Sequence, residues 1–153
     1  MTGLRADEIR TKIQSWRKGI AAHERESLSQ AIDHRLLHWF QSHLEHSAPG
    51  TLWGSYRPLP WEWDIPRTHL WLIQRKVRLV FPRVSRLEPG SLQWHEARLD
   101  QPGHWDANFK LSSLQEPVGH LPKVDPIHLH GVIVPGVAFS LLGERMGTGG
   151  GYY

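Results

Sequence analysis

The sequence predicts an α/β domain in which helices pack in layers against a largely parallel sheet. Amphipathic helical segments and short apolar strands follow each other in the order helix, strand, helix, strand, as in layered α/β proteins. The chain has 153 residues, of which 39% are hydrophobic, and this is enough for a sizeable core. We therefore expect one domain over residues 1–153.

Three helices are expected in the first half of the chain. Apolar residues at helical spacing predict a helix over residues 5–18, and a second apolar stripe over residues 28–44 predicts a longer one. The second helix should end before the Pro-Gly pair at 49–50. A third helix should begin near Pro66, because proline suits a first helical turn, with Asp64 as its cap.

Four strands are expected, at residues 51–56, 77–81, 92–99 and 131–135. The second should stop at Pro82, and the fourth, which is continuously apolar, should be buried. Ligands of parallel sheets bind beyond the carboxyl ends of the strands. The site is therefore expected in the loops that follow Tyr56, Pro82 and Pro135.

Composition narrows the classes of function. The chain has no cysteine, which excludes disulfides, thiolate metal sites and a cysteine nucleophile and is consistent with a cytoplasmic location. Its apolar runs are too short to cross a bilayer, so no membrane partner is expected. The net charge of +3 suits an anionic ligand, and because no dense basic stripe is present, nucleic acid is not an expected partner. A basic nucleic-acid module is the weakest alternative.

The end of the chain is rich in glycine, which occupies four of the five positions from 147 to 151. Glycine lets the backbone approach a ligand closely, and successive N–H groups can form an anion-binding concavity. Arg145 before this segment can bind a phosphate through a charge-assisted fork, and Tyr152 and Tyr153 after it supply rings and hydroxyls. Neither the Walker A nor the dinucleotide pattern is present. By composition alone, the segment fits a phosphate-binding loop or a flexible tail.

The wider context of the glycines decides between these interpretations. The chain reads Val132-Ile133-Val134-Pro135-Gly136-Val137-Ala138-Phe139 and then Gly143-x-Arg145-x-Gly147-x-Gly149-x-Gly151-Tyr152-Tyr153. This pattern closely resembles the signature of the 5-formyltetrahydrofolate cyclo-ligase family. Further similarities are Tyr56 with Glu62-x-Asp64, Phe81-Pro82-Arg83, Glu116-Pro117, and Arg10 on the first helix.

The resemblance implies a three-layer α/β/α fold of the NagB/RpiA/CoA-transferase type. It also implies conversion of 5-formyltetrahydrofolate to 5,10-methenyltetrahydrofolate, with ATP and Mg²⁺ as cofactors and release of ADP and phosphate. Arg145 and Tyr152 are the expected catalytic residues. The expected ATP-binding residues are Arg5, Arg10, Arg145, Gly147, Thr148, Gly149, Gly150, Gly151, Tyr152 and Tyr153. The expected folate-binding residues are Arg57, Trp61, Glu62 and Tyr152, with Trp63 as a further stacking ring.

Three departures from the family pattern stand out. Ser140 replaces an aspartate, and Ala6 replaces a lysine whose role Arg5 is expected to take. The sequence stops at Tyr153, where the family continues with an aspartate, an arginine, and a final strand and helix. The expected metal ligand follows Tyr153, so no residue is assigned to metal binding. These departures leave a non-catalytic folate- or nucleotide-binding protein as the alternative, with the oligomeric state open.

Overall fold

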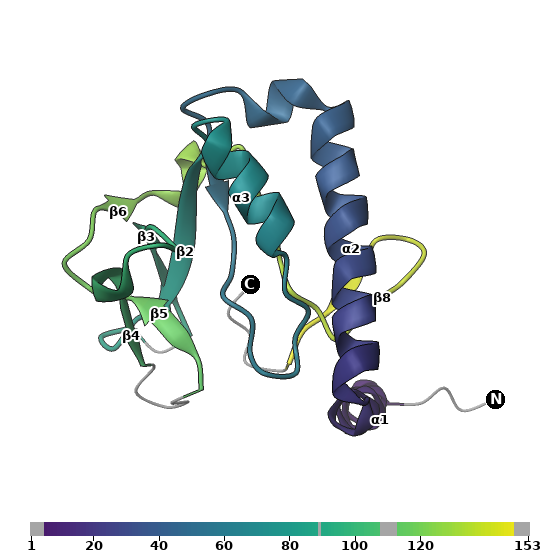
Figure 1. The fold of residues 1–153 in the computed structure, drawn as a ribbon. Coiled ribbons are helices and arrows are strands. Elements are labelled where there is room, and N and C mark those ends of the chain that lie inside the picture. The colour runs from purple at the N-terminus through teal and green to yellow at the C-terminus, as the bar shows by residue number, and fades with distance from the viewer. Residues whose placement is uncertain (1–4, 89, 108–112, 149–153) are drawn as a thin grey trace.

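The computed structural model describes residues 5–88, 90–107 and 113–148, which form a mixed α/β fold around a central sheet (Figure 1). Its helices are α1 (Ala6–Gly19), α2 (Ala22–Ser42) and α3 (Pro66–Gln74), with short 3₁₀ helices at Leu44–Ser47, Pro102–His104 and Pro126–His128. Within these residues, no helix has both the length and the apolar character that a membrane span requires.

The central sheet has five strands in the order β6–β3–β2–β1–β7. β1 pairs in parallel with β2 and β7, whereas β3 is antiparallel to both β2 and β6. Only β3 therefore opposes the other strands, which confirms the predicted mostly parallel sheet. The strands are β1 (Leu52–Gly54), β2 (Arg78–Val84), β3 (Leu92–Glu96), β6 (Lys123–Val124) and β7 (Gly131–Val132).

Two small two-stranded sheets lie outside the central one. β4 (Trp105–Ala107) pairs with β5 (Gln115–Pro117), and β8 (Ala138–Phe139) pairs with β9 (Arg145–Met146). β5 is tied to the end of β2, because Glu116 is buried and its carboxylate accepts the Val84 N–H at 2.8 Å. Arg83 also donates to the Pro117 carbonyl at 2.7 Å. The Glu-Pro pair that supported the family resemblance therefore joins two sheets.

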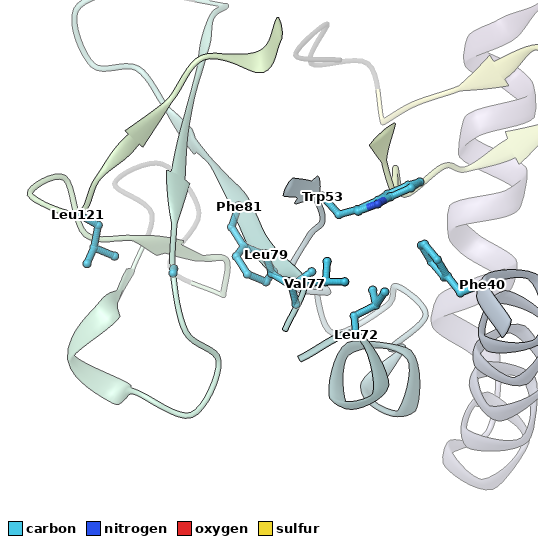
Figure 2. Close-up of a cluster of buried hydrophobic side chains, with 8 residues drawn as sticks. Phe40, Trp53, Leu72, Val77, Leu79, Phe81 and Leu121 are labelled. Atoms are coloured by element: carbon cyan, nitrogen blue, oxygen red, sulfur yellow. The ribbon is translucent and has the colours of Figure 1, made fainter. Parts of the chain in front are cut away.

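Much of the core lies between the central sheet and helices α2 and α3, and the same cluster extends away from these helices to Leu121 (Figure 2). Phe40 on α2 meets Trp53 on β1 edge to face, with ring centroids 4.9 Å apart, and Leu72 on α3 packs into the same cluster. Burying side chains of this size contributes about 2–3 kcal/mol each. This packing fixes the helices against β1 and β2, and it thereby sets where the loops beyond these strands begin.

The predicted cap of α3 was wrong. The N-cap position belongs to Ile65, and the Asp64 carboxylate accepts from the N–H of Ile65 rather than from an N–H inside the helix. The helix is capped instead by Asp33 on α2, which is buried and accepts from the N–H groups of Arg67 and Thr68 at 2.8 and 2.9 Å. The carboxylate pairs two of the N–H groups that a helix start leaves unsatisfied and lies at the positive end of the helix dipole.

Two strand predictions also need correction. β2 continues through Pro82 to Val84. β1 ends at Gly54, level with Val80, and from there on β3 is the one strand among the described residues that pairs with β2 in a ladder. A proline is tolerated where a strand has an unpaired side. The strand predicted at 131–135 is limited to Gly131–Val132, and Val132 is exposed. The segment after Val132 is loop, which frees it for the contacts described below.

At position 76, glycine is expected to give a more stable protein than alanine. Lys76 follows the end of α3 with φ at +62°, in the left-handed region where a side chain is strained and glycine is favoured. We expect Lys76→Gly to raise the free energy of unfolding by about 0.5–1 kcal/mol relative to Lys76→Ala, because left-handed strain of about 1–2 kcal/mol outweighs the entropic cost of glycine, which is about 0.5–1 kcal/mol. Urea denaturation of both variants measures this, and equal stabilities would contradict it.

Candidate functional site

The candidate site lies where the loops after β1 and β7 meet helix α1. These two strands are neighbours and parallel, so their carboxyl ends open on the same edge of the sheet. Figure 1 shows α1 at the foot of α2, and side chains of α1 contact both loops. This is the position at which parallel sheets bind their ligands.

Arg10 on α1 reaches the glycine-rich segment. Its Nε donates to the Gly147 carbonyl at 3.0 Å, across 137 residues of sequence, and its other end pairs with Asp7. Arg145 donates to the Pro135 carbonyl at 2.9 Å. The structure therefore brings together Arg10, Arg145 and Gly147, three of the expected phosphate-binding residues.

Two further expected ATP contacts are exposed, and the others cannot be placed. Thr148 follows Gly147 and faces solvent. Arg5 precedes α1, is exposed, and donates its backbone N–H to the Glu8 carboxylate. The remaining expected ATP-binding residues lie outside the described residues; they are Gly149, Gly150, Gly151, Tyr152 and Tyr153.

Glu62 occupies a tight turn in the loop after β1. Its carboxylate accepts the Leu59 N–H at 2.9 Å, and its own N–H donates to the Leu59 carbonyl at the same distance. Burial raises the pKa of Glu62, and the Leu59 N–H and the charge of Arg17 partly oppose this rise. The side chain also lines a groove of about 790 Å³ between this loop and α2. Glu62 is thus a fixed, partly desolvated hydrogen-bond acceptor.

The two tryptophans beside Glu62 face basic side chains of α1. Lys18 Nζ lies 6.0 Å from the Trp61 ring centroid, and the Arg17 guanidinium carbon lies 5.3 Å from that of Trp63. The Trp63 carbonyl accepts the Tyr56 hydroxyl at 2.7 Å, which ties the loop back to the end of β1. Both expected stacking rings are therefore at the edge of the sheet where the expected phosphate-binding residues meet.

Sequence analysis missed Arg17, which is buried and joins the two loops. One of its terminal nitrogens donates to the carbonyls of Gly136 and Val137 at 2.9 and 3.1 Å. Burial lowers the pKa of its guanidinium, and the charge of Glu62 opposes this. The sequence does indicate that Arg17 can reach the site, because it lies seven residues after Arg10 and hence on the same face of the helix. Its loop partners could not be read from local spacing.

Arg57 is directed to another part of the molecule. Its guanidinium carbon lies 4.5 Å from the Trp105 ring centroid, and burial lowers its pKa against the opposing charge of Asp64. It lines a groove of about 960 Å³ together with Tyr56, Asp64 and residues of α3 and β3. Within the described residues, no contact links Arg57 to Arg10.

Ser140 organises the turn between β8 and β9. Its Oγ accepts the N–H groups of Leu142 and Glu144 at 3.2 and 3.1 Å. An aspartate carboxylate can accept the same two N–H groups, so the departure from the family pattern preserves the chemistry of the turn.

Removal of the Ser140 hydroxyl should loosen this turn locally. We expect amide hydrogen exchange at Leu142 and Glu144 to become about fivefold faster in Ser140→Ala, since each lost hydrogen bond is worth about 1 kcal/mol. Ser140→Asp should keep the slow exchange. If Ser140→Ala left both amides unchanged, the hydroxyl would have no role in the turn.

No metal centre can be assigned from the described side chains. Within residues 5–88, 90–107 and 113–148, no group of three or more His, Asp or Glu side chains is placed to hold an ion. We therefore assign Mg²⁺ no protein ligand among these residues.

An α/β fold with basic residues, a carboxylate and tryptophans at the carboxyl edge of its sheet is typical of proteins that bind small ligands. Comparison with family patterns specifies the class: the chain matches the 5-formyltetrahydrofolate cyclo-ligase family over residues 4–153. The chain therefore belongs to this family of ligases. The comparison with curated sequences yields no significant match.

Two solved structures are similar to the chain. The 5,10-methenyltetrahydrofolate synthetase of Aquifex aeolicus is 25% identical, with a TM-score of 0.72 over 98% of this chain and 70% of that one. The synthetase of Mycoplasma pneumoniae is 17% identical, with a TM-score of 0.72 over 98% of this chain and 75% of that one, and supports the fold alone. The predicted fold class and the family resemblance are thus confirmed.

Proposed function

We propose that the chain uses ATP to convert 5-formyltetrahydrofolate to 5,10-methenyltetrahydrofolate, with release of ADP and phosphate. The observation that carries this proposal is the contact between Arg10 and Gly147, which places a cation of α1 against the expected phosphate-binding segment. Membership of the cyclo-ligase family supports the reaction type. A cytoplasmic site of action is part of the same proposal.

The reaction needs the formyl oxygen to become a leaving group. In the proposed sequence this oxygen attacks the γ-phosphorus of ATP, and the bond to ADP breaks. Nitrogen 10 of the folate then attacks the formyl carbon and loses its proton, and the carbon–oxygen bond breaks to release phosphate. Enzymes assist phosphoryl transfer mainly by positioning and by charge stabilisation.

The side chains of the site suit these demands. Arg10 and Arg145 are proposed to neutralise phosphate charge, and Gly147 and Thr148 to border the triphosphate. The proposed ATP contacts are completed by Arg5, Gly149, Gly150, Gly151, Tyr152 and Tyr153. Magnesium, as an expected cofactor, would supply further neutralisation of the phosphate oxygens when bound.

The folate is proposed to bind on the side of Glu62. The half-buried carboxylate can accept from the N–H donors of a pterin, and the rings of Trp61 and Trp63 can stack on it. Tyr152 is proposed to contact the folate beside Arg145, at the reacting centre. Arg57 lines the larger groove, from which its guanidinium could meet a carboxylate of the folate tail.

The proposal is tested by following the absorbance of methenyltetrahydrofolate while the chain is mixed with 5-formyltetrahydrofolate, ATP and MgCl₂. Product formation that requires ATP supports it. Calorimetry with a non-hydrolysable ATP analogue and with the folate distinguishes the alternative. Saturable binding of both without product would indicate a binding protein, and failure to bind either would overturn both functions.

A further inference from the structure

Arg17 makes its contacts in the interior, although arginine is normally a surface residue. Only 7% of it is exposed, and it lies midway between the two loops of the candidate site. It donates to Gly136 and Val137 in the loop after β7, and its cation lies over Trp63 in the loop after β1. A single side chain therefore connects both loops to α1.

The burial of this charge is costly, and the cost is not fully offset. Within the described residues the Nε of Arg17 is buried without a hydrogen-bond partner, and Arg25 on α2 adds a second positive charge nearby. Favourable charge comes from Glu62. An apolar side chain of similar length would fill the same space without desolvating a cation. Stability alone gives little reason for an arginine here.

The contacts of Arg17 explain its presence better. Its two carbonyl acceptors follow Pro135 directly, and Pro135 accepts from Arg145. On the other side, Trp63 adjoins Glu62 in the chain. Arg17 thus lies between the residues proposed to hold phosphate and the residue proposed to hold the pterin. Productive transfer requires these two groups at a fixed separation, because misplacement of about 1 Å can cost about 100-fold in rate.

We propose that Arg17 is a positioning residue that holds the loop of Glu62 and Trp63 and the segment of Gly136 and Val137 in one arrangement, across which folate and ATP meet. This inference rests on the proposed function. It assigns Arg17 no contact with either substrate, so its loss should impair the use of both.

The kinetic test uses the full chain with Arg17→Met, Arg17→Lys and the control Lys12→Met, which removes an exposed charge from the same helix. In Arg17→Met, kcat/KM should fall about 100-fold for ATP and for the folate alike. Arg17→Lys keeps the positive charge and a single donor nitrogen, so its kcat/KM should be about tenfold higher than that of Arg17→Met. Lys12→Met should stay within about twofold of the wild type, as expected for an exposed residue without described contacts.

The kinetic outcomes separate this inference from the proposed function. A loss confined to KM for ATP would make Arg17 an ordinary phosphate ligand and overturn the positioning role. If the wild type turned over and Arg17→Met had the same kcat/KM, the inference would be overturned but the proposed function would not. No turnover by the wild type would overturn the function itself.

A second measurement needs no turnover. The pKa of Glu62 can be followed by NMR of its ¹³C-labelled carboxyl, with Glu62→Gln used to assign the signal. The groups that act on it are the Leu59 N–H and Arg17, with Arg25 and Tyr56 around Arg17. We expect a higher pKa of Glu62 in Arg17→Met, and nearly the wild-type pKa in Arg17→Lys and Lys12→Met. An unchanged pKa in a folded Arg17→Met would overturn the link between the two residues.

Discussion

Replacement of Arg10 by methionine is expected to lower kcat/KM for ATP about 100-fold. The guanidinium is proposed to neutralise phosphate charge, and a hydrogen bond to a charged group is worth about 1.5–3 kcal/mol. The same side chain holds the Gly147 carbonyl at 3.0 Å, so its removal also releases the glycine-rich segment from α1. Both effects weaken the binding of the triphosphate.

The pattern across substrates distinguishes this prediction from the one for Arg17. KM for ATP should rise in Arg10→Met, whereas KM for the folate should change by less than about threefold, because Arg10 is proposed to contact the phosphates and not the folate. Calorimetry with an ATP analogue checks the binding directly. Equal ATP affinity in Arg10→Met and the wild type would remove Arg10 from the proposed phosphate site. Lys12→Met again serves as the control for a charge lost from α1.

The parts of the fold that local sequence encodes were predicted, and those that depend on distant partners were not. The helices α1, α2 and α3 follow from apolar periodicity and from Pro66. The cap of α3 did not follow, because Asp33 precedes the helix by more than thirty residues and reaches it only after α2 and α3 have packed. The passage of β2 through Pro82 likewise depends on where β1 ends, which no local pattern reveals.

The candidate site shows the same division. Arg10, Arg145 and Gly147 were predicted because their spacing matches a family pattern, and the structure brings them together. Arg17 was missed, since its function as a link appears only when the loops after β1 and β7 are adjacent. The expected role of Arg57 in folate binding stays a prediction. Its contact with the Trp105 ring of β4 could not be predicted, because the two residues lie far apart in the sequence.

The stability of the protein should fall steeply on mild acidification because of His69. This histidine on α3 is buried, and its Nε2 lies 2.7 Å from the Oγ of Ser55, which directly follows β1. Burial lowers the pKa of His69 to about 4. The charges of Asp64 and Asp33 oppose this shift, and the charge of Arg57 adds to it. The unfolded chain has the ordinary imidazole pKa of about 6.5, so it binds the proton more tightly than the folded state does.

The direction of the effect follows from these two values. The contribution of neutral His69 is complete above about pH 6.5 and is lost progressively as the pH falls towards 4. The full loss is about 3 kcal/mol, of which about 2 kcal/mol falls between pH 7.5 and 5. Urea denaturation at several pH values across this interval measures it, above the range in which most carboxylates titrate.

A matched pair of variants isolates the contribution of His69 from the other groups that titrate. The pKa of buried His95 is also lowered and adds to the loss in acid, whereas the raised pKa of Glu62 acts in the opposite direction. His69→Gln keeps a polar group within reach of Ser55 but does not titrate, so its stability should depend on pH less than that of the wild type by about 2 kcal/mol over the interval. His23→Gln, at an exposed position on α2, should retain the full wild-type dependence. Equal losses of stability in His69→Gln and the wild type between pH 7.5 and 5 would contradict the prediction. They would mean that folding does not lower the pKa of His69.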